Sequence, residues 1–280
     1  MLEIAYTDIK FGADIGCSGS FWDPTAATNA PSALLNGEKV TDSVADWVLK
    51  GFAYGPIPMS EVPKSAKFNG LMTVPKPNGS VRIILNLSAP LGSSVNDSIN
   101  NDDFPASMSS TTKWLRSMNR AGRSCKFCKI DWADAYKHIA VRLEDTELQW
   151  FQWLNMAFKE LCFVFGGKSS VGIFDRTAKI VVFIVIVRSN FDSRLVCQHL
   201  DACCAAASAD SMILEIFDAT FYNVAEELGI KLAPRDDPEK SFAPSRYGTV
   251  LGIDYDSVSW TWALREDKIL RILHLIKELQ

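Results

Sequence analysis

The chain has 280 residues, of which 48% are hydrophobic and 22% charged, with a formal net charge of -4. This length holds one large domain or two small ones, and the composition excludes wholesale disorder, a collagen-like repeat and a small disulfide-bonded scaffold. The acidic balance also argues against a surface coated in positive charge for nucleic acid, although basic residues that cluster locally would overturn that inference.

The sequence predicts no membrane association and no secretion. The longest unbroken aliphatic-aromatic run covers residues 180–187, far short of the roughly 20 residues that a membrane helix needs. The chain does not open with the charged-then-apolar pattern of a signal peptide. Seven cysteines, an odd number, favour reduced thiols. We therefore expect an intracellular protein, cytoplasmic or nuclear.

The first 40 residues are rich in small and polar types without a sustained period, which predicts a loosely structured extension. From Thr41 the pattern tightens. The stretch TDSVADWVLKGF predicts a short helix that is capped by Thr41 or Ser43 and ends at Gly51.

A β-hairpin is predicted over LMTVPKPNGSVRIILNLS. Asn78-Gly79 is typical of a type I′ turn, and β-branched and aliphatic residues flank it on both sides. Lys76 lies near the tip and Arg82 on the return strand. From the pattern alone, these two charges are ordinary solvated groups of a surface hairpin.

Six basic residues and no acidic ones lie between Lys113 and Lys129. Four of them recur three or four residues apart, on one face of a predicted helix: Lys113, Arg116, Arg120 and Arg123. Such a face is either simply solvated or binds backbone phosphates. Nearby, Cys125 and Cys128 form a CxxC motif that lacks the second ligand pair of a zinc site, so no structural metal is predicted there.

Two aspartates follow strand-like segments. KFCKIDWADAYKHIAV runs from a strand-like into a helix-like stretch with Asp131 at the strand's end, and SRLVCQHLDACCAAAS has two apolar runs around Asp201, as in a hairpin. If the two carboxylates met across a sheet, they would repel unless a metal or protons neutralised them. Magnesium prefers such oxygen ligands, so a paired-aspartate magnesium site is one interpretation.

In order, five segments resemble the reverse transcriptases, and in particular the polymerases of retrotransposons such as the DIRS-like, tyrosine-recombinase type. The resemblance spans about Thr41 to the C-terminus. It is carried by VPKPNGSVRIILNLS, KIDWADAY, VFGGKSSVGIFDR, QHLDACC, and AEELGIKLAPRDDPEKSF with RYGTVLGIDYDSVSW.

The resemblance implies an α+β, right-hand polymerase fold with fingers and palm, in which an antiparallel palm sheet is backed by helices and the thumb is truncated. Asp131 and Asp201 would lie on adjacent strands of that sheet. The implied parts are an N-terminal extension (1–40), fingers (41–106 and 139–165), palm (107–138 and 166–262) and the start of the thumb (263–280), where LREDKILRILHLIKEL is amphipathic.

It also implies the site residues. Asp131 and Asp201 would hold two Mg²⁺ ions, or Mn²⁺ as a substitute, with the carbonyl of Trp132 completing one shell, and Lys240 would protonate pyrophosphate. Lys76 and Arg82 would hold the triphosphate, and Tyr136 would exclude a ribose 2′-OH. The whole set for the incoming deoxynucleotide is Lys76, Arg82, Asp134, Ala135, Tyr136, Gly166 and Lys168. The set for the template and primer is Lys113, Arg116, Arg120, Arg123, Tyr247 and Gly248.

One position departs from the family pattern. Asp201 is followed by Ala202, where the family has a second aspartate that supports the ion at the primer 3′-OH. Loss of that ligand would slow the reaction by orders of magnitude, each tenfold costing about 1.4 kcal/mol. Neither Asp192 nor Asp210 lies within the expected turn to replace it.

Three functions follow from these observations. The first is an RNA-directed DNA polymerase that extends a DNA primer on an RNA template by two-metal nucleotidyl transfer, accompanied in the intact element by ribonuclease H, recombinase or integrase domains. The second is an inactive relic or a domesticated nucleic-acid-binding module, which Ala202 and the short thumb favour. The third is a viral RNA-dependent RNA polymerase, which Tyr136 and the hairpin disfavour.

Overall fold

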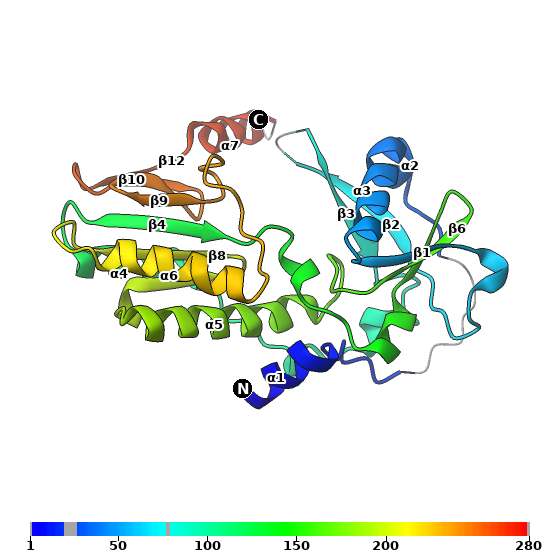
Figure 1. Ribbon diagram of the computed structural model, residues 1–280. Helices are drawn as coiled ribbons and strands as arrows, with labels where there is room; N and C mark the ends of the chain where they lie inside the picture. The colour runs from blue at the N-terminus through cyan, green and yellow to red at the C-terminus, as the bar shows by residue number, and fades with distance from the viewer. Residues whose placement is uncertain (1, 20–26, 77–78, 279–280) are drawn as a thin grey trace. The chain divides into compact units, whose positions relative to one another are not determined.

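The computed structural model describes residues 2–19, 27–76 and 79–278 (Figure 1). It divides into two compact units, residues 1–106 with 134–176 (unit 1) and residues 107–133 with 177–280 (unit 2). Helices make up 41% and strands 26% of the structure, which confirms the predicted α+β class. Among the described residues, no helix combines the length and apolarity needed to cross a bilayer.

The elements have the following bounds. The helices are α1 (Leu2–Phe11), α2 (Pro31–Leu35), α3 (Gly37–Leu49), α4 (Thr111–Ala121), α5 (Ser170–Ser189), α6 (Ile213–Glu227) and α7 (Glu266–Glu278). The strands are β1 (Ala53–Pro58), β2 (Gly70–Pro75), β3 (Val81–Asn86), β4 (Lys126–Asp131), β5 (Trp150–Trp153), β6 (Met156–Glu160), β7 (Val196–His199), β8 (Ala202–Ala207), β9 (Phe242–Ser245), β10 (Tyr247–Val250), β11 (Ile253–Asp256) and β12 (Thr261–Leu264).

Unit 1 is built on an antiparallel sheet of order β1-β6-β5 and on the β2–β3 hairpin. Phe151 and Phe158, directly opposite each other on β5 and β6, stack with ring centroids 5.4 Å apart. The predicted β2–β3 hairpin is confirmed, with Pro75 opposite Val81. In its turn Gly79 has a φ of 78°, whereas Asn78 lies outside the described residues.

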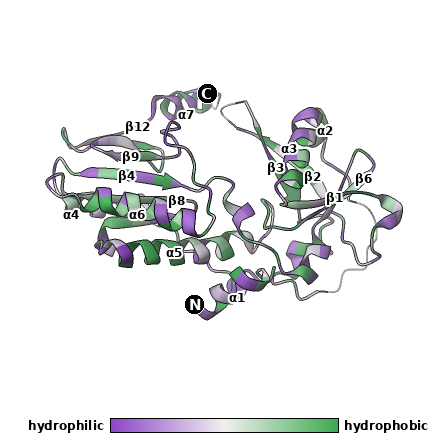
Figure 2. Ribbon diagram, viewed as in Figure 1, coloured by the Kyte–Doolittle hydropathy of each residue, from purple (hydrophilic) through white to green (hydrophobic). Residues whose placement is uncertain are grey.

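Unit 2 is centred on a four-stranded antiparallel sheet of order β7-β8-β4-β9. Because side chains alternate along a strand, one face of β4 carries Phe127 and Asp131. Phe127 packs there with Trp114 of α4 and Tyr255 of β11. Helix α6 packs against β4, β8 and β9, and Figure 2 shows hydrophobic residues along much of α5.

The predicted parts and the observed units divide the chain at similar positions. Both predicted fingers segments, 41–106 and 139–165, fall within unit 1, and residues 107–133 and 177–262 of the predicted palm fall within unit 2. Residues 134–138 and 166–176, assigned to the palm, lie in unit 1. The boundary at 176/177 falls within α5, and residues 263–280 lie in unit 2.

Two predictions for the N-terminal region were wrong. The extension over residues 1–40 contains α1, α2 and the start of α3. Pro31, a residue suited to the first turn of a helix, begins α2. Helix α3 begins at Gly37, so Thr41 and Ser43 are not caps: their hydroxyls donate to the carbonyls of Gly37 and Lys39 at 2.9 and 2.8 Å, one turn back within the helix. The predicted end near Gly51 is confirmed.

Two further boundaries differ from prediction. Helix α4 ends at Ala121, because Gly122 adopts a φ of 91°, so Arg123 lies beyond the helix. The helix-like stretch after Asp131 is a single 3₁₀ turn, η4, over Ala135–His138.

Candidate active site

The predicted meeting of Asp131 and Asp201 is confirmed in unit 2. Asp131 is the last residue of β4, and Asp201 lies in the two-residue turn that joins β7 to β8. Antiparallel register pairs Asp131 with Ala202, and the backbone N–H of Trp132 donates to the carbonyl of Asp201 at 3.0 Å. Asp201 is therefore in the turn rather than on a strand, and Ala202 faces Asp131 directly.

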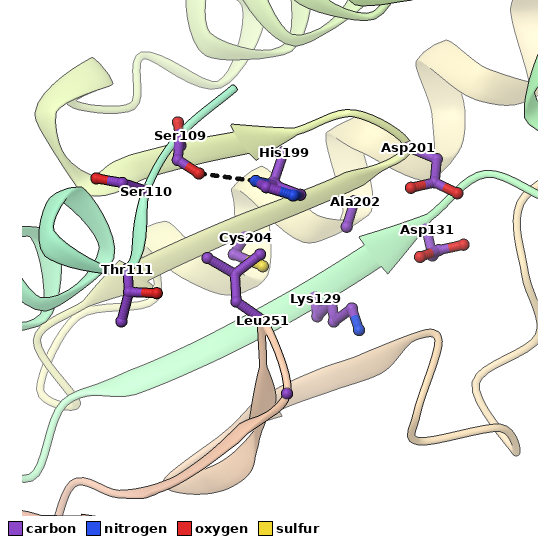
Figure 3. A pocket seen from close by; sticks show the side chains of 11 residues that line it. Ser109, Ser110, Thr111, Lys129, Asp131, His199, Asp201, Ala202, Cys204 and Leu251 are labelled. Carbon is purple, nitrogen blue, oxygen red and sulfur yellow. Dashed lines mark hydrogen bonds between the residues drawn. The ribbon is translucent and has the colours of Figure 1, made fainter. Parts of the chain in front are cut away.

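Both carboxylates line a cavity of about 570 Å³ that belongs wholly to unit 2. Figure 3 shows Asp131 and Asp201 close together, with the serines that precede α4 and His199 farther along the pocket. The other lining residues are Ser109, Ser110, Thr111, Lys129, His199, Ala202, Cys204, Leu251 and Gly252. The sequence analysis did not predict three of these as site residues: Lys129, His199 and Cys204. Alternation of side chains along β4 and β8 could have indicated two of them, because Lys129 lies on the same face as Asp131 and Cys204 on the same face as Ala202.

Asp131 is only 4% exposed. Burial, followed by the negative charge of Asp201, raises its pKa to about 6, against the opposing effect of Lys240 and Lys129. The ammonium of Lys240 lies 3.5 Å from the nearer Asp131 oxygen. The charge of Asp201 thus disfavours the ionisation of Asp131, and a cation between the two carboxylates would relieve that repulsion.

The loop that carries Lys240 is attached to β4. The Lys129 ammonium donates to the carbonyl of Glu239 at 2.7 Å, and the Asp131 N–H donates to the hydroxyl of Ser241 at 3.0 Å. Lys240 and Asp131 therefore come together through contacts on both sides of Lys240.

The donors in the pocket fit one hard cation better than two. Magnesium is commonly held by one or two carboxylates plus water and phosphate oxygens, a demand that Asp131 and Asp201 meet. Within the described residues, no group of three or more acidic, His or Cys side chains is placed to hold a metal ion. Ala202 offers no oxygen, and Asp192 is paired with Arg194 at 2.7 Å.

The predicted template–primer residues lie in two places in unit 2. Lys113, Arg116 and Arg120 are exposed on α4, opposite its buried face. Arg123, beyond the helix, donates from Nε to the carbonyl of Val258 at 3.3 Å.

The other two residues of that set belong to the β10–β11 hairpin. Tyr247 is exposed, whereas Gly248 lies against the ring of Phe242. The part of this hairpin that lines the carboxylate pocket is its turn, Leu251-Gly252, rather than Tyr247 and Gly248.

The predicted nucleotide-binding residues all lie in unit 1. The guanidinium of Arg82 sits 4.6 Å from the ring centroid of Phe165, and that ring meets Tyr136 edge-on at 4.8 Å. Tyr136 is buried and also contacts Phe174 at 5.7 Å. Phe165 therefore contacts both Arg82 and Tyr136. The sequence analysis did not predict this role, and the one feature of the sequence that pointed to Phe165 was an aromatic residue directly before Gly166.

The remaining members of this set have separate surroundings. Gly166 has a φ of 112°, and Lys168 is tied to the backbone, its ammonium donating to the carbonyl of Ile99 at 2.8 Å. Lys76 is exposed beside the hairpin turn. Asp134, with a φ of 52°, precedes η4, and Ala135 is buried within it.

No protein-family model matches the chain, and no curated protein is significantly similar to it in sequence. Its fold resembles that of foamy virus protease-reverse transcriptase. The structure in complex with double-stranded DNA matches with a TM-score of 0.64 and 16% identity over 91% of this chain and 48% of that one. The complex with an RNA/DNA hybrid matches with a TM-score of 0.63 and 17% identity over 92% of this chain and 31% of that one.

The native prototype foamy virus enzyme matches with a TM-score of 0.61 and 15% identity, over 90% of this chain and 29% of that one. The chain thus spans less than half the length of each of these structurally similar proteins. Its fold resembles that of the reverse transcriptase polymerase domain.

Proposed function

We propose that the chain is the polymerase domain of an RNA-directed DNA polymerase, with weak activity because Ala202 replaces a carboxylate. The observation that carries the proposal is the pocket in which Asp131 faces Ala202 across β4 and β8, with Asp201 in the adjoining turn and Lys240 beside Asp131. A template RNA, a DNA primer and deoxynucleoside triphosphates are the proposed ligands, as in the retrotransposon enzymes that the sequence resembles.

Asp131 and Asp201 are the residues that would hold Mg²⁺, together with the carbonyl of Trp132. Bound there, the ion would supply charge neutralisation for phosphoryl transfer. The Asp131 carboxyl must be ionised to bind it, so affinity should rise with pH through the range in which Asp131 loses its proton. With Ala202 in place, a second ion lacks a protein oxygen on that side.

The residues of unit 1 fit the selection of a deoxynucleotide. Phe165 holds the Arg82 guanidinium by a cation–π contact and leaves its N–H groups for phosphate oxygens. The same ring packs against Tyr136, so the proposed phosphate contact and the proposed ribose filter share one support. Gly166 follows Phe165 directly and, because it has no Cβ, lets the Leu85 backbone of β3 pack against it, which helps to fix the position of Phe165.

A second candidate function is template–primer binding without catalysis. Two observations favour it. The pocket has two carboxylates, Asp131 and Asp201, where the family pattern has three, and the basic face of α4 is exposed. Phosphate binding by that face requires no metal site.

Primer extension on an RNA template with Mg²⁺ and deoxynucleotides distinguishes the two functions. We expect Ala202→Asp to extend the primer at least roughly a hundredfold faster than the unmodified chain, because a carboxylate opposite Asp131 restores a ligand. Ala202→Asn is the matched control, equal in size but uncharged, and should give no such gain.

Two results would contradict the polymerase proposal or its explanation. Equal rates for the unmodified chain and Ala202→Asp would mean that the missing ligand has no effect. An absence of extension by every variant, with template–primer binding retained, would favour the binding module.

A further inference from the structure

We propose that Arg235 is a positioning residue that sets Lys240 beside Asp131, by anchoring their shared loop to α6. The inference deepens the proposed function, on which the role of Lys240 rests. It concerns the loop of residues 228–241, which joins α6 to β9 within unit 2.

Both ends of this loop are attached to β4 and the residues that follow it. On the α6 side, Ala133 N–H donates to the carbonyl of Lys231 at 2.9 Å, and Ala233 N–H donates to the carbonyl of Asp131 at 2.8 Å. On the β9 side, Ser241 accepts from the Asp131 N–H. Between these attachments, residues 234–240 are exposed, and side-chain contacts at Arg235 and from Lys129 to the Glu239 carbonyl add to the backbone hydrogen bonds that fix their path.

Arg235 makes such a contact at the start of the exposed stretch. Its guanidinium donates to the Asp218 carboxylate at 2.5 Å and lies 4.2 Å from the ring centroid of Tyr222. Asp218 and Tyr222 are four residues apart on α6 and so share one face of the helix. A planar guanidinium can use the carboxylate and the ring together, which a lysine cannot do as well.

The Asp218 carboxyl has few alternative partners. Its side chain is 8% exposed, and burial raises its pKa despite the opposing effect of Arg235. Among the described residues, its second oxygen has no hydrogen-bond partner. A buried carboxylate of this kind favours the conformation that keeps Arg235 in contact.

The backbone carries this anchor on to Lys240. Two residues after Arg235, the carbonyl of Asp237 accepts hydrogen bonds from the N–H groups of both Lys240 and Ser241 at 2.9 Å. Fixing the start of the turn at Arg235 therefore restricts where the Lys240 side chain leaves the backbone. Without the anchor, Lys240, whose side chain is 49% exposed, has freedom to leave Asp131.

The test observes the full chain by NMR after its lysines have been reductively methylated with ¹³C, a modification that keeps their charge. The Lys240 signal is assigned by its absence from Lys240→Arg. It should differ between the methylated chain without substitutions and methylated Asp131→Asn, because the neighbouring charged carboxylate is lost. We expect Arg235→Gln and Asp218→Asn to move the Lys240 signal to its position in Asp131→Asn, and Arg235→Lys to move it partway.

Lys126 serves as the internal reference. It pairs at 2.6 Å with Glu215, which lies on α6 as Asp218 does, and neither Lys126 nor Glu215 belongs to the loop of residues 228–241. Its signal should stay in place in the Arg235 and Asp218 variants and move in the matched control Glu215→Gln, where Lys240 stays in place. A Lys240 signal unmoved in both variants would overturn the proposal. So would joint movement of Lys126 and Lys240, which would indicate loosening of α6 as a whole.

No template or nucleotide enters this measurement. A failed positioning role therefore leaves the polymerase proposal intact, and absent primer extension leaves the positioning role intact.

Discussion

Ionisation of Asp131 opposes folding, because the carboxyl is buried beside Asp201. Its pKa is about 6 in the folded chain against 3.8 for the ordinary group, so the folded state binds the proton more tightly. By linkage, the free energy of unfolding falls as pH rises from about 4 to about 6 and is then level, with a total loss of about 3 kcal/mol.

Asp131→Asn removes this ionisation. We expect the variant to match the unmodified chain near pH 4 and to be more stable by about 2–3 kcal/mol near pH 8. Urea unfolding at both pH values measures the difference. An equal effect of the substitution at the two pH values would contradict the electrostatic explanation.

Single residues differed in how far the sequence could predict them. Asp131 and Asp201 were predictable, because each closes a short apolar run and the family pattern fixes their order. Phe165 was not, since an aromatic residue before a glycine is equally typical of a core; its role depends on where Arg82 and Tyr136 fold. The place of Lys129 in the pocket was not predictable either, because its neighbours depend on the register of β4 with the adjacent strands.

At the scale of elements, the segment before α5 depends on one backbone conformation. Gly166 has a φ of 112°, and a Cβ added there would lie 2.0 Å from the carbonyl oxygen of Leu85 on β3. The Phe165 carbonyl meanwhile accepts from the Leu85 N–H at 3.0 Å, which holds the two backbones together. Only glycine allows this approach of the segment to the β2–β3 hairpin.

Gly166→Ala should therefore lower the free energy of unfolding by roughly 3 kcal/mol or more, since strain and overlap with backbone combine. Gly51→Ala is the control: Gly51 also has a positive φ, of 73°, but nothing lies within 4 Å of its added Cβ. We expect it to cost only about 1 kcal/mol. Denaturant unfolding compares them, and equal costs would show that the close approach is unimportant.

Element boundaries show where local sequence signals stop being sufficient. The β2–β3 and β7–β8 hairpins were predictable, because turn residues and alternation agree. The start of α3 was not: hydroxyl residues occur both as caps and inside helices, and Thr41 and Ser43 are of the second kind. The 3₁₀ turn after Asp131 carries Tyr136, whose burial against Phe174 is a tertiary contact that no local pattern reveals.

For the molecule as a whole, the net charge of -4 hides a local cationic surface. Neutralising it by Lys113→Gln, Arg116→Gln and Arg120→Gln together should weaken template–primer binding. Each phosphate contact on a duplex contributes roughly 0.9 to the slope of log affinity against log salt, so the slope should fall by about 2–3. Fluorescence anisotropy across a salt series measures it.

The control for this experiment carries the same change in charge elsewhere. Lys10, Lys50 and Lys64 are exposed residues of unit 1, and their triple replacement by Gln should leave the salt slope within about 1 of the unmodified value. Equal losses in the two triple variants would mean that only the total charge of the chain matters and that α4 is not a binding face.

The interleaving of the two units has a consequence for biosynthesis. The central strand β4 leaves the ribosome well before β8 and β9, because residues 134–176, which complete unit 1, are translated in between. Throughout that interval β4, which is largely buried in the folded protein, has both edges unpaired in the nascent chain. Exposed strand edges of this kind favour aggregation. We therefore expect synthesis to benefit from shielding of β4, by a chaperone or by transient contacts, until the hairpin bearing Asp201 emerges to pair with it.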